Sequence, residues 1–179
     1  MTAFRSDEFN DDKLDFRILR DGGVWLYWRT QYLEEDAGWL RSTGYNVIEF
    51  ECAEWDSVDK MHDSLSTLQT FPSYYGRNLD ALNECMCDDL EIPEEGGLCL
   101  ALKHYDAFSK GPGAPMNSKQ GTAEIVLNIL ARASRCQMLI GRRLITLVQS
   151  DDPKVRFDRL DSVGAAWNCR EWFNRDRGQ

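Results

Sequence analysis

The stretch GGLCLAL, residues 96–102, carries no charge and is apolar at every position after its two glycines. A strand that is apolar on both faces is typical of a parallel sheet covered by helices on both sides. Similar apolar runs lie before and after it in the chain: VWLYW (24–28), NVIEFEC (46–52) and LITLV (144–148). These runs predict the strands of one sheet, with 96–102 as its central strand.

Helical periodicity fills the segments between these strands. Gly44 is a suitable stop for the first helix, and Asp56 or Ser57 is a suitable N-cap for the second. The apolar positions are Leu33, Ala37 and Leu40; Val58, Met61, Leu65 and Leu68; Leu79, Leu82, Met86 and Leu90; and Val126, Ile129, Leu130 and Ala133. The alternation predicts an α/β fold, a small and mostly parallel sheet of about four or five strands covered by helices. We expect a single domain over residues 1–179.

The ends of the chain and one internal segment differ from this pattern. Residues 1–21 are charged and aperiodic, so we expect a loosely ordered start. The segment 109–121, SKGPGAPMNSKQG, is rich in Gly, Pro and Ser and predicts a loop. After Asp151 we expect a short strand near 155–157 and a final helix over 163–173.

The charge and the apolar content of the chain argue against two classes of protein, nucleic-acid binders and membrane proteins. The 179 residues include 30 acidic and 21 basic ones, and the resulting net charge of -9 argues against a nucleic-acid binder. No apolar run is long enough to span a bilayer, and the first residues lack the pattern of a secretory signal. We therefore expect a cytoplasmic protein without nucleic-acid or membrane partners. We also expect reduced core thiols at the six cysteines. These are Cys52, Cys85, Cys87, Cys99, Cys136 and Cys169.

Motifs for catalysis or metal binding are missing from the sequence. His62 and His104 lie on different expected elements, and neither belongs to a recognisable catalytic motif. Cys85 and Cys87 have no second Cys or His pair that would complete a zinc site. No Gly-rich nucleotide loop and no nucleophile elbow occurs. We therefore predict no catalytic residue, no cofactor and no metal.

The segment FPSYYGRNLDALNEC, residues 71–85, is the most informative in the chain. Gly76 can take a positive φ, and Asn78 is a suitable N-cap for the helix that follows. On a regular helix Asp80, Glu84 and Asp88 would form one acidic stripe, because they recur every four residues. Such a stripe is explained either by simple solvation or by a cationic partner.

Two further observations favour a partner. The range 78–102 holds seven carboxylates and no Lys or Arg, so the helix itself carries no cation that would neutralise the stripe. Tyr74 and Tyr75 directly precede the helix, and tyrosines are enriched in protein interfaces. We expect one of the two tyrosines to lie in the core.

The same segment resembles the signature of the barstar family of intracellular ribonuclease inhibitors, which has the form P-x-Y-Y-G-x-N-L-D-A-L-x-D-C. The matching residues are Pro72, Tyr74, Tyr75, Gly76, Asn78, Leu79, Asp80, Ala81, Leu82 and Cys85. The order of expected strands and helices also agrees. The resemblance implies a barstar-like core over 46–150, an added strand–helix unit over 22–45, and a C-terminal strand–helix addition over 151–179.

The resemblance also implies how the protein acts. The motif helix and the turn before it would enter the active site of a ribonuclease toxin, bound one-to-one. Tyr74 would pack against the enzyme, Asp80 would meet its basic residues, and Glu84 would stand where the enzyme expects a phosphate. The implied partner-binding residues are Tyr74, Tyr75, Gly76, Arg77, Asn78, Asp80, Asn83, Glu84, Cys87 and Asp88.

Four positions depart from barstar and favour a ribonuclease other than barnase. Glu84 replaces an aspartate, Asn83 a tryptophan, Arg77 an acidic residue and Arg132 a glutamate. Two other functions remain open. One is an acidic module that binds a basic protein other than a nuclease. The other is an enzyme that uses Asp80 and Glu84 as an acid/base pair.

Overall fold

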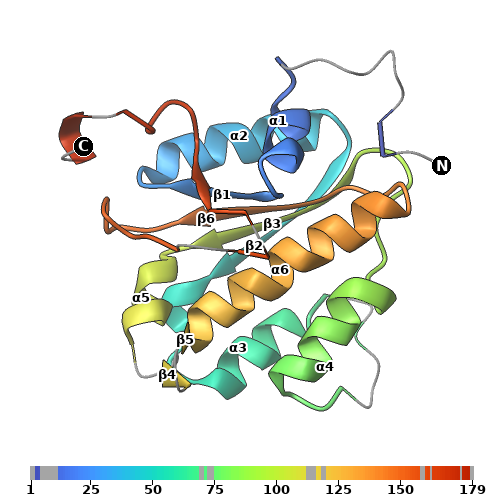
Figure 1. Cartoon of the computed structure of the whole chain (residues 1–179), viewed down its shortest axis with the longest axis vertical. Helices are drawn as coiled ribbons and strands as arrows, with labels where there is room; N and C mark the ends of the chain where they lie inside the picture. The colour runs from blue at the N-terminus through green and yellow to red at the C-terminus, as the bar shows by residue number, and fades with distance from the viewer. Residues whose placement is uncertain are drawn as a thin grey trace.

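Five parallel strands form the sheet, in the order β2-β3-β6-β1-β7 (Figure 1). They are β1 (Val24–Tyr27), β2 (Tyr45–Glu51), β3 (Gly97–Lys103), β6 (Leu144–Gln149) and β7 (Ala166–Trp167). The computed structural model describes residues 3–4, 12–68, 71, 75–111, 116–117, 120–157, 160–161, 163–173 and 175–177. The prediction of a mostly parallel sheet of this size is confirmed. The apolar stretch 96–102 supplies β3, which pairs with β2 on one side and β6 on the other.

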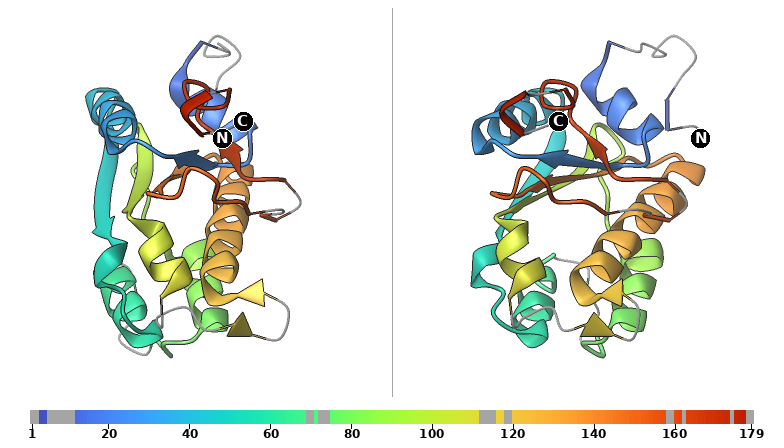
Figure 2. Two further views of the ribbon diagram at one scale, coloured as in Figure 1. Left: turned by 90° about the vertical axis from the view of Figure 1, so that its left-hand side faces the viewer. Right: turned by 60° about the vertical axis from the view of Figure 1, so that its left-hand side comes forward.

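Helices cover both faces of the sheet (Figures 1 and 2). They are α1 (Leu14–Arg20), α2 (Thr30–Ser42), α3 (Val58–Leu65), α4 (Leu79–Glu84), α5 (Tyr105–Lys110) and α6 (Thr122–Leu139). Helices α1 and α2 lie on one face, and α3, α4 and α6 lie on the other. Successive side chains of β1 serve the two cores in turn, since a strand alternates its faces. Trp25 and Tyr27 pack with α1 and α2, whereas Val24 and Leu26 join the larger core beneath α3 and α6.

The start of the chain contains a helix where the sequence predicts loose structure. That prediction is wrong for α1, whose Ile18 and Leu19 are buried. The carboxylate of Asp15 is also buried, accepts a hydrogen bond from Tyr45 Oη at 3.0 Å and lies 3.5 Å from Arg143 Nη1. Residues remote in the sequence therefore hold this helix in place.

The end of the chain also differs from the prediction. Residues 155–157 form no strand, and the segment 163–173 is not the expected helix. Instead, Ala166 and Trp167 form β7, the edge strand, and pair with Trp25 and Leu26 of β1. Pairing with β1 has overridden the local helical pattern. A short 3₁₀ turn follows at Arg175–Arg177.

The predicted loop over 109–121 is partly regular. Its first residues, Ser109 and Lys110, end α5, a helix that the sequence analysis did not predict. Further along, β4 (Met116–Asn117) pairs antiparallel with β5 (Gln120–Gly121), which leads directly into α6.

The cysteines are all described, and none forms a disulfide. Cys52, Cys85 and Cys99 are buried, as the core prediction expects, and Cys87 and Cys136 are half-buried. Cys169 is exposed, so the core prediction is wrong for this thiol.

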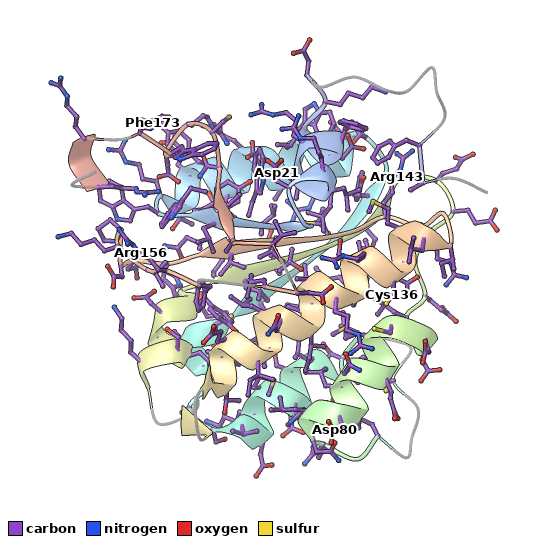
Figure 3. All side chains as sticks on the ribbon, in the orientation of Figure 1. Asp21, Asp80, Cys136, Arg143, Arg156 and Phe173 are labelled. Atoms are coloured by element: carbon purple, nitrogen blue, oxygen red, sulfur yellow. The ribbon has the colours of Figure 1, made fainter. Side chains whose placement is uncertain are left out.

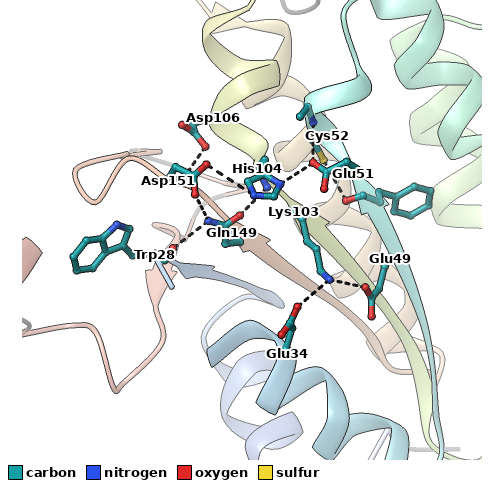
Figure 4. Close-up of polar contacts among 12 residues, drawn as sticks. Trp28, Glu34, Glu49, Glu51, Cys52, Lys103, His104, Asp106, Gln149 and Asp151 are labelled. Carbon is teal, nitrogen blue, oxygen red and sulfur yellow. Dashed lines mark hydrogen bonds and ion pairs between the residues drawn. The ribbon is translucent and has the colours of Figure 1, made fainter. Parts of the chain in front are cut away.

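Polar side chains connect the carboxyl ends of the strands (Figure 4). Gln149 Oε1 accepts a hydrogen bond from the backbone N of His104 at 2.7 Å, and Gln149 Nε2 donates to Trp28 O at 3.1 Å and to Asp151 Oδ1 at 2.9 Å. His104 Nδ1 lies 2.7 Å from Glu51 Oε1. These contacts fix the ends of β1, β2, β3 and β6 against one another, and they engage the His104 ring through Nδ1.

Candidate functional site

The acidic helix α4 begins at a side-chain cap, as the sequence predicts. Asn78 Oδ1 accepts a hydrogen bond from Ala81 N at 2.9 Å, and Asn78 Nδ2 donates to Gly76 O at 3.2 Å. These bonds satisfy one of the free N–H groups at the helix start and close the preceding turn. Leu82 anchors the opposite side of the helix in the core.

The carboxylates of Asp80, Glu84 and Asp88 are exposed, and none has a side-chain hydrogen bond or ion pair within the described part of the chain. Asp80 and Glu84 lie one turn apart on α4. Asp88 lies in the π-helical turn Cys85–Asp89 that continues α4. A π turn bonds i to i+5 and is wider than an α turn, so Asp88 does not continue the straight stripe expected for a regular helix.

The turn before α4 is left-handed at Arg77, where φ is +47°, whereas Gly76, which could take a positive φ, does not adopt one. The Arg77 side chain forms an ion pair with Asp63 of α3. This pairing directs the one cation of the motif toward α3.

Tyr75 anchors the turn to α3. Its half-buried ring packs edge-on against Phe71, with centroids 4.7 Å apart, and its hydroxyl is hydrogen-bonded to His62 Nδ1. Tyr75 is therefore partly buried, and burial raises its pKa. Tyr74 lies outside the described residues.

His62 has a structural role in the core beneath the turn. The ring is fully buried, and within the described residues its Nε2 has no hydrogen-bond partner. Burial lowers the pKa of His62, and the charge of Arg77 lowers it further, while Asp59 opposes the shift. The sequence signal was the position of His62, four residues after Val58 and three before Leu65, which places it on the apolar face of α3.

The π turn is attached to α6. Gln137 Nε2 donates to Cys87 O at 2.8 Å and to Met86 O at 3.4 Å. The Cys87 thiol is half-buried, and burial together with a hydrogen bond to Cys136 raises the pKa of Cys87 to about 12. Asn83 on α4 is also half-buried. The structure therefore places Cys87 and Asn83 closer to the packed side of the helix than the three exposed carboxylates.

A groove of about 1010 Å³ continues from the π turn to the sheet. Its acidic lining consists of Asp88, Asp89, Glu91 and Glu94, and its apolar lining includes Ile48, Leu68, Leu90, Ile92 and Leu98. Arg142 contributes a basic side chain to the lining. The acidic surface of α4 thus extends into a partly apolar groove.

Metal clusters and membrane spans were also sought among the residues that the structure describes. No group of three or more His, Cys, Asp or Glu side chains among them could hold a metal ion. No helix within the described ranges is long and apolar enough to cross a membrane.

Comparison with known proteins identifies a family and a relative. The family described as "Barstar (barnase inhibitor)" matches residues 45–147, which is more than half of the chain. A relative from Bacillus subtilis (strain 168), named "Putative ribonuclease inhibitor YrdF", is 38% identical over 53 residues. That alignment covers 30% of this chain and 54% of the relative, so the chain spans about half the length of the curated relative that it matches.

Proposed function

The chain belongs to the barstar family, and from that premise we propose that it inhibits a ribonuclease by placing the acidic face of α4 in the active site. A ribonuclease must bind RNA phosphates, and cationic or N–H donors do so through charge-assisted hydrogen bonds. Carboxylates at the same positions offer those donors equivalent acceptors. The partner is thus a basic ribonuclease, bound one-to-one, and the protein itself is not an enzyme.

The observation that carries this proposal is the set of exposed carboxylates at Asp80, Glu84 and Asp88, which have no partner among the described residues. They stand on an element held by the Asn78 cap and by Gln137. A rigid, preorganised acidic surface loses little conformational entropy when it binds.

The residues proposed to meet the enzyme lie along the turn and the helix. Tyr74 and Gly76 contact the rim of the active site, and Asp80 and Glu84 meet its cations. Tyr75, Arg77 and Asn78 shape the turn through their contacts with His62, Asp63 and Ala81. The flanking members of the surface are Asn83, Cys87 and Asp88.

The biological role that fits best is immunity, in which a cell blocks its own toxic ribonuclease. The complementary charges would attract a basic toxin quickly at low ionic strength, as in the well-known barnase and barstar pair. Glu84 reaches one methylene further than the aspartate of the family signature, and Asn83 offers no indole. The cognate ribonuclease would therefore have a different pocket from that of barnase.

Co-expression with a panel of toxic ribonucleases, barnase included, tests the proposal. We expect growth to be rescued against at least one of them, and the purified protein should then block RNA cleavage by that enzyme at a one-to-one ratio. If it rescues growth against none and affinity capture recovers a basic protein without nuclease activity, the protein is an acidic binding module for that partner.

A further inference from the structure

The C-terminal segment encloses a pocket of about 280 Å³ at the β7 edge of the sheet. Two arginines and three aromatic residues contribute to its lining: Arg156, Arg177, Phe157, Trp167 and Trp172. In Figure 3, Arg156 and Phe173 lie along the left-hand edge of the molecule, whereas Asp80 lies at the bottom. The pocket is thus separate from the acidic surface of α4.

Arg177 is the unusual residue of this pocket. It is only 3% exposed, and its guanidinium carbon lies 3.6 Å from the centroid of the Trp167 ring. Its Nε and Nη1 have no hydrogen-bond partner among the described residues. Buried donors without acceptors are costly and rare in folded proteins. Arginine keeps its charge under ordinary conditions, so deprotonation cannot relieve that cost.

The nearby carboxylate of Glu171 does not accept hydrogen bonds from Arg177 Nε or Nη1. Its Oε2 accepts from Trp28 N at 2.9 Å and from Asn168 Nδ2 at 2.5 Å, and its Oε1 accepts from Arg29 N at 3.0 Å. Glu171 is fully buried and holds the start of α2 through these bonds. Burial lowers the pKa of Arg177, and the charge of Glu171 only partly opposes that shift.

We propose that this pocket binds a small organic anion, a carboxylate carried on a flat aromatic ring. The carboxylate supplies the acceptors that Arg177 lacks, through charge-assisted hydrogen bonds. Two arginines against the one carboxylate of Glu171 leave a single net positive charge among these groups, which suits a monoanion better than a phosphate dianion.

The apolar lining defines the rest of the ligand. Phe157, Trp167 and Trp172 provide aromatic surfaces against which a flat ring packs. Trp172 is 58% exposed and stacks in parallel on Phe173, so an open aromatic rim leads into the pocket. The volume lies below the roughly 300–1,000 Å³ typical of sites for drug-sized ligands, so the ligand has one or two rings.

Calorimetric titration of the full chain with 2-naphthoate tests the proposal. We expect saturable binding of 2-naphthoate, and no binding of the neutral amide 2-naphthamide or of acetate, which has no ring. Arg177→Met keeps a long apolar side chain but removes the donors, and should weaken binding by about tenfold or more. Arg175→Met, an exposed arginine in the same turn, is the matched control and should bind as the wild type does.

Thermal unfolding separates a binding role from a structural one. Since Arg177→Met removes buried donors that lack acceptors, its unfolding midpoint should stay level or rise. If Arg177→Met does not fold, Trp172→Ala, which removes an exposed ring, should bind 2-naphthoate more weakly. The proposal is overturned if the wild type does not bind 2-naphthoate. It is also overturned if folded Arg177→Met, or Trp172→Ala where Arg177→Met does not fold, binds 2-naphthoate as tightly as the wild type.

Discussion

Lowering the pH from 7 to 5 should destabilise the protein because of a single buried ring, His62. The ring lies beneath the turn that leads into α4, where Nδ1 is bonded to the Tyr75 hydroxyl and the described residues offer Nε2 no partner. Adding a proton there would place a charge in a core that also holds Met61 and Leu65.

The direction of the effect follows from the lowered pKa of His62. As the pH falls, the unfolded chain takes up a proton near the ordinary value of about 6.5, before the folded protein does. The contribution of His62 to stability is therefore complete above that pH and is lost as the pH falls through the lower pKa of the folded state. One proton changes the free energy of unfolding by at most about 1.4 kcal/mol per pH unit between the two values.

Urea unfolding at pH 7, 6 and 5 measures this slope. His62→Asn is the comparison, because its amide can still meet the Tyr75 hydroxyl but does not titrate. The variant should be less stable at pH 7, where it leaves a cavity, yet lose less stability than the wild type between pH 7 and 5. Equal slopes for the two proteins would refute the role assigned to His62.

Two other changes test the local structure, each by chemical unfolding. Asn78→Ala removes the bond to Ala81 N and should lower the free energy of unfolding by about 1 kcal/mol, whereas Asn78→Ser should retain most of the cap; a fully stable Asn78→Ala would contradict the capping role. Gly96→Ala should cost at least about 2 kcal/mol, because φ is +78° and a Cβ would lie 2.1 Å from Gly44 O. Its control, Gly38→Ala in the open middle of α2, should gain about 0.5–1 kcal/mol, and a loss in both variants would contradict the steric reason given for Gly96.

The strands could be predicted because each buried strand is a run of mostly apolar residues that are consecutive in the sequence. In β3 the apolar side chains of 98–102 face two cores at once, so no position tolerates a charge. The cap at Asn78 could be predicted for a similar reason, since a cap depends on residues within one helical turn.

The features that the sequence analysis missed depend on distant partners. Helix α1 is held by the contacts of Asp15 with Tyr45 and Arg143, which lie 30 and 128 residues away. The pairing of β7 with β1 likewise joins segments about 140 residues apart, as the bond from Asn168 N to Leu26 O shows. No local pattern in the sequence reveals such contacts. In the segment 163–173 the spacing of apolar residues is helical, so it predicts a helix where the structure has β7.

Gly76 is the residue of the motif that can take a positive φ most easily, because it is a glycine. The structure places the positive φ at Arg77, whose side chain is held by Asp63. The ion pair joins the turn to α3, a contact that residue spacing does not reveal.

The central claim is that α4 blocks a ribonuclease through its carboxylates. The most direct measurement uses the ribonuclease found by co-expression. It asks how strongly the double variant Asp80→Lys with Glu84→Lys inhibits RNA cleavage by that enzyme. A second double variant, Glu54→Lys with Glu95→Lys, alters two exposed carboxylates elsewhere and carries the same net charge. We predict that the first variant folds but loses inhibition by at least about a hundredfold, while the second inhibits nearly as well as the wild type. Full inhibition by the Asp80 and Glu84 variant, or equal loss in both variants, would contradict the account.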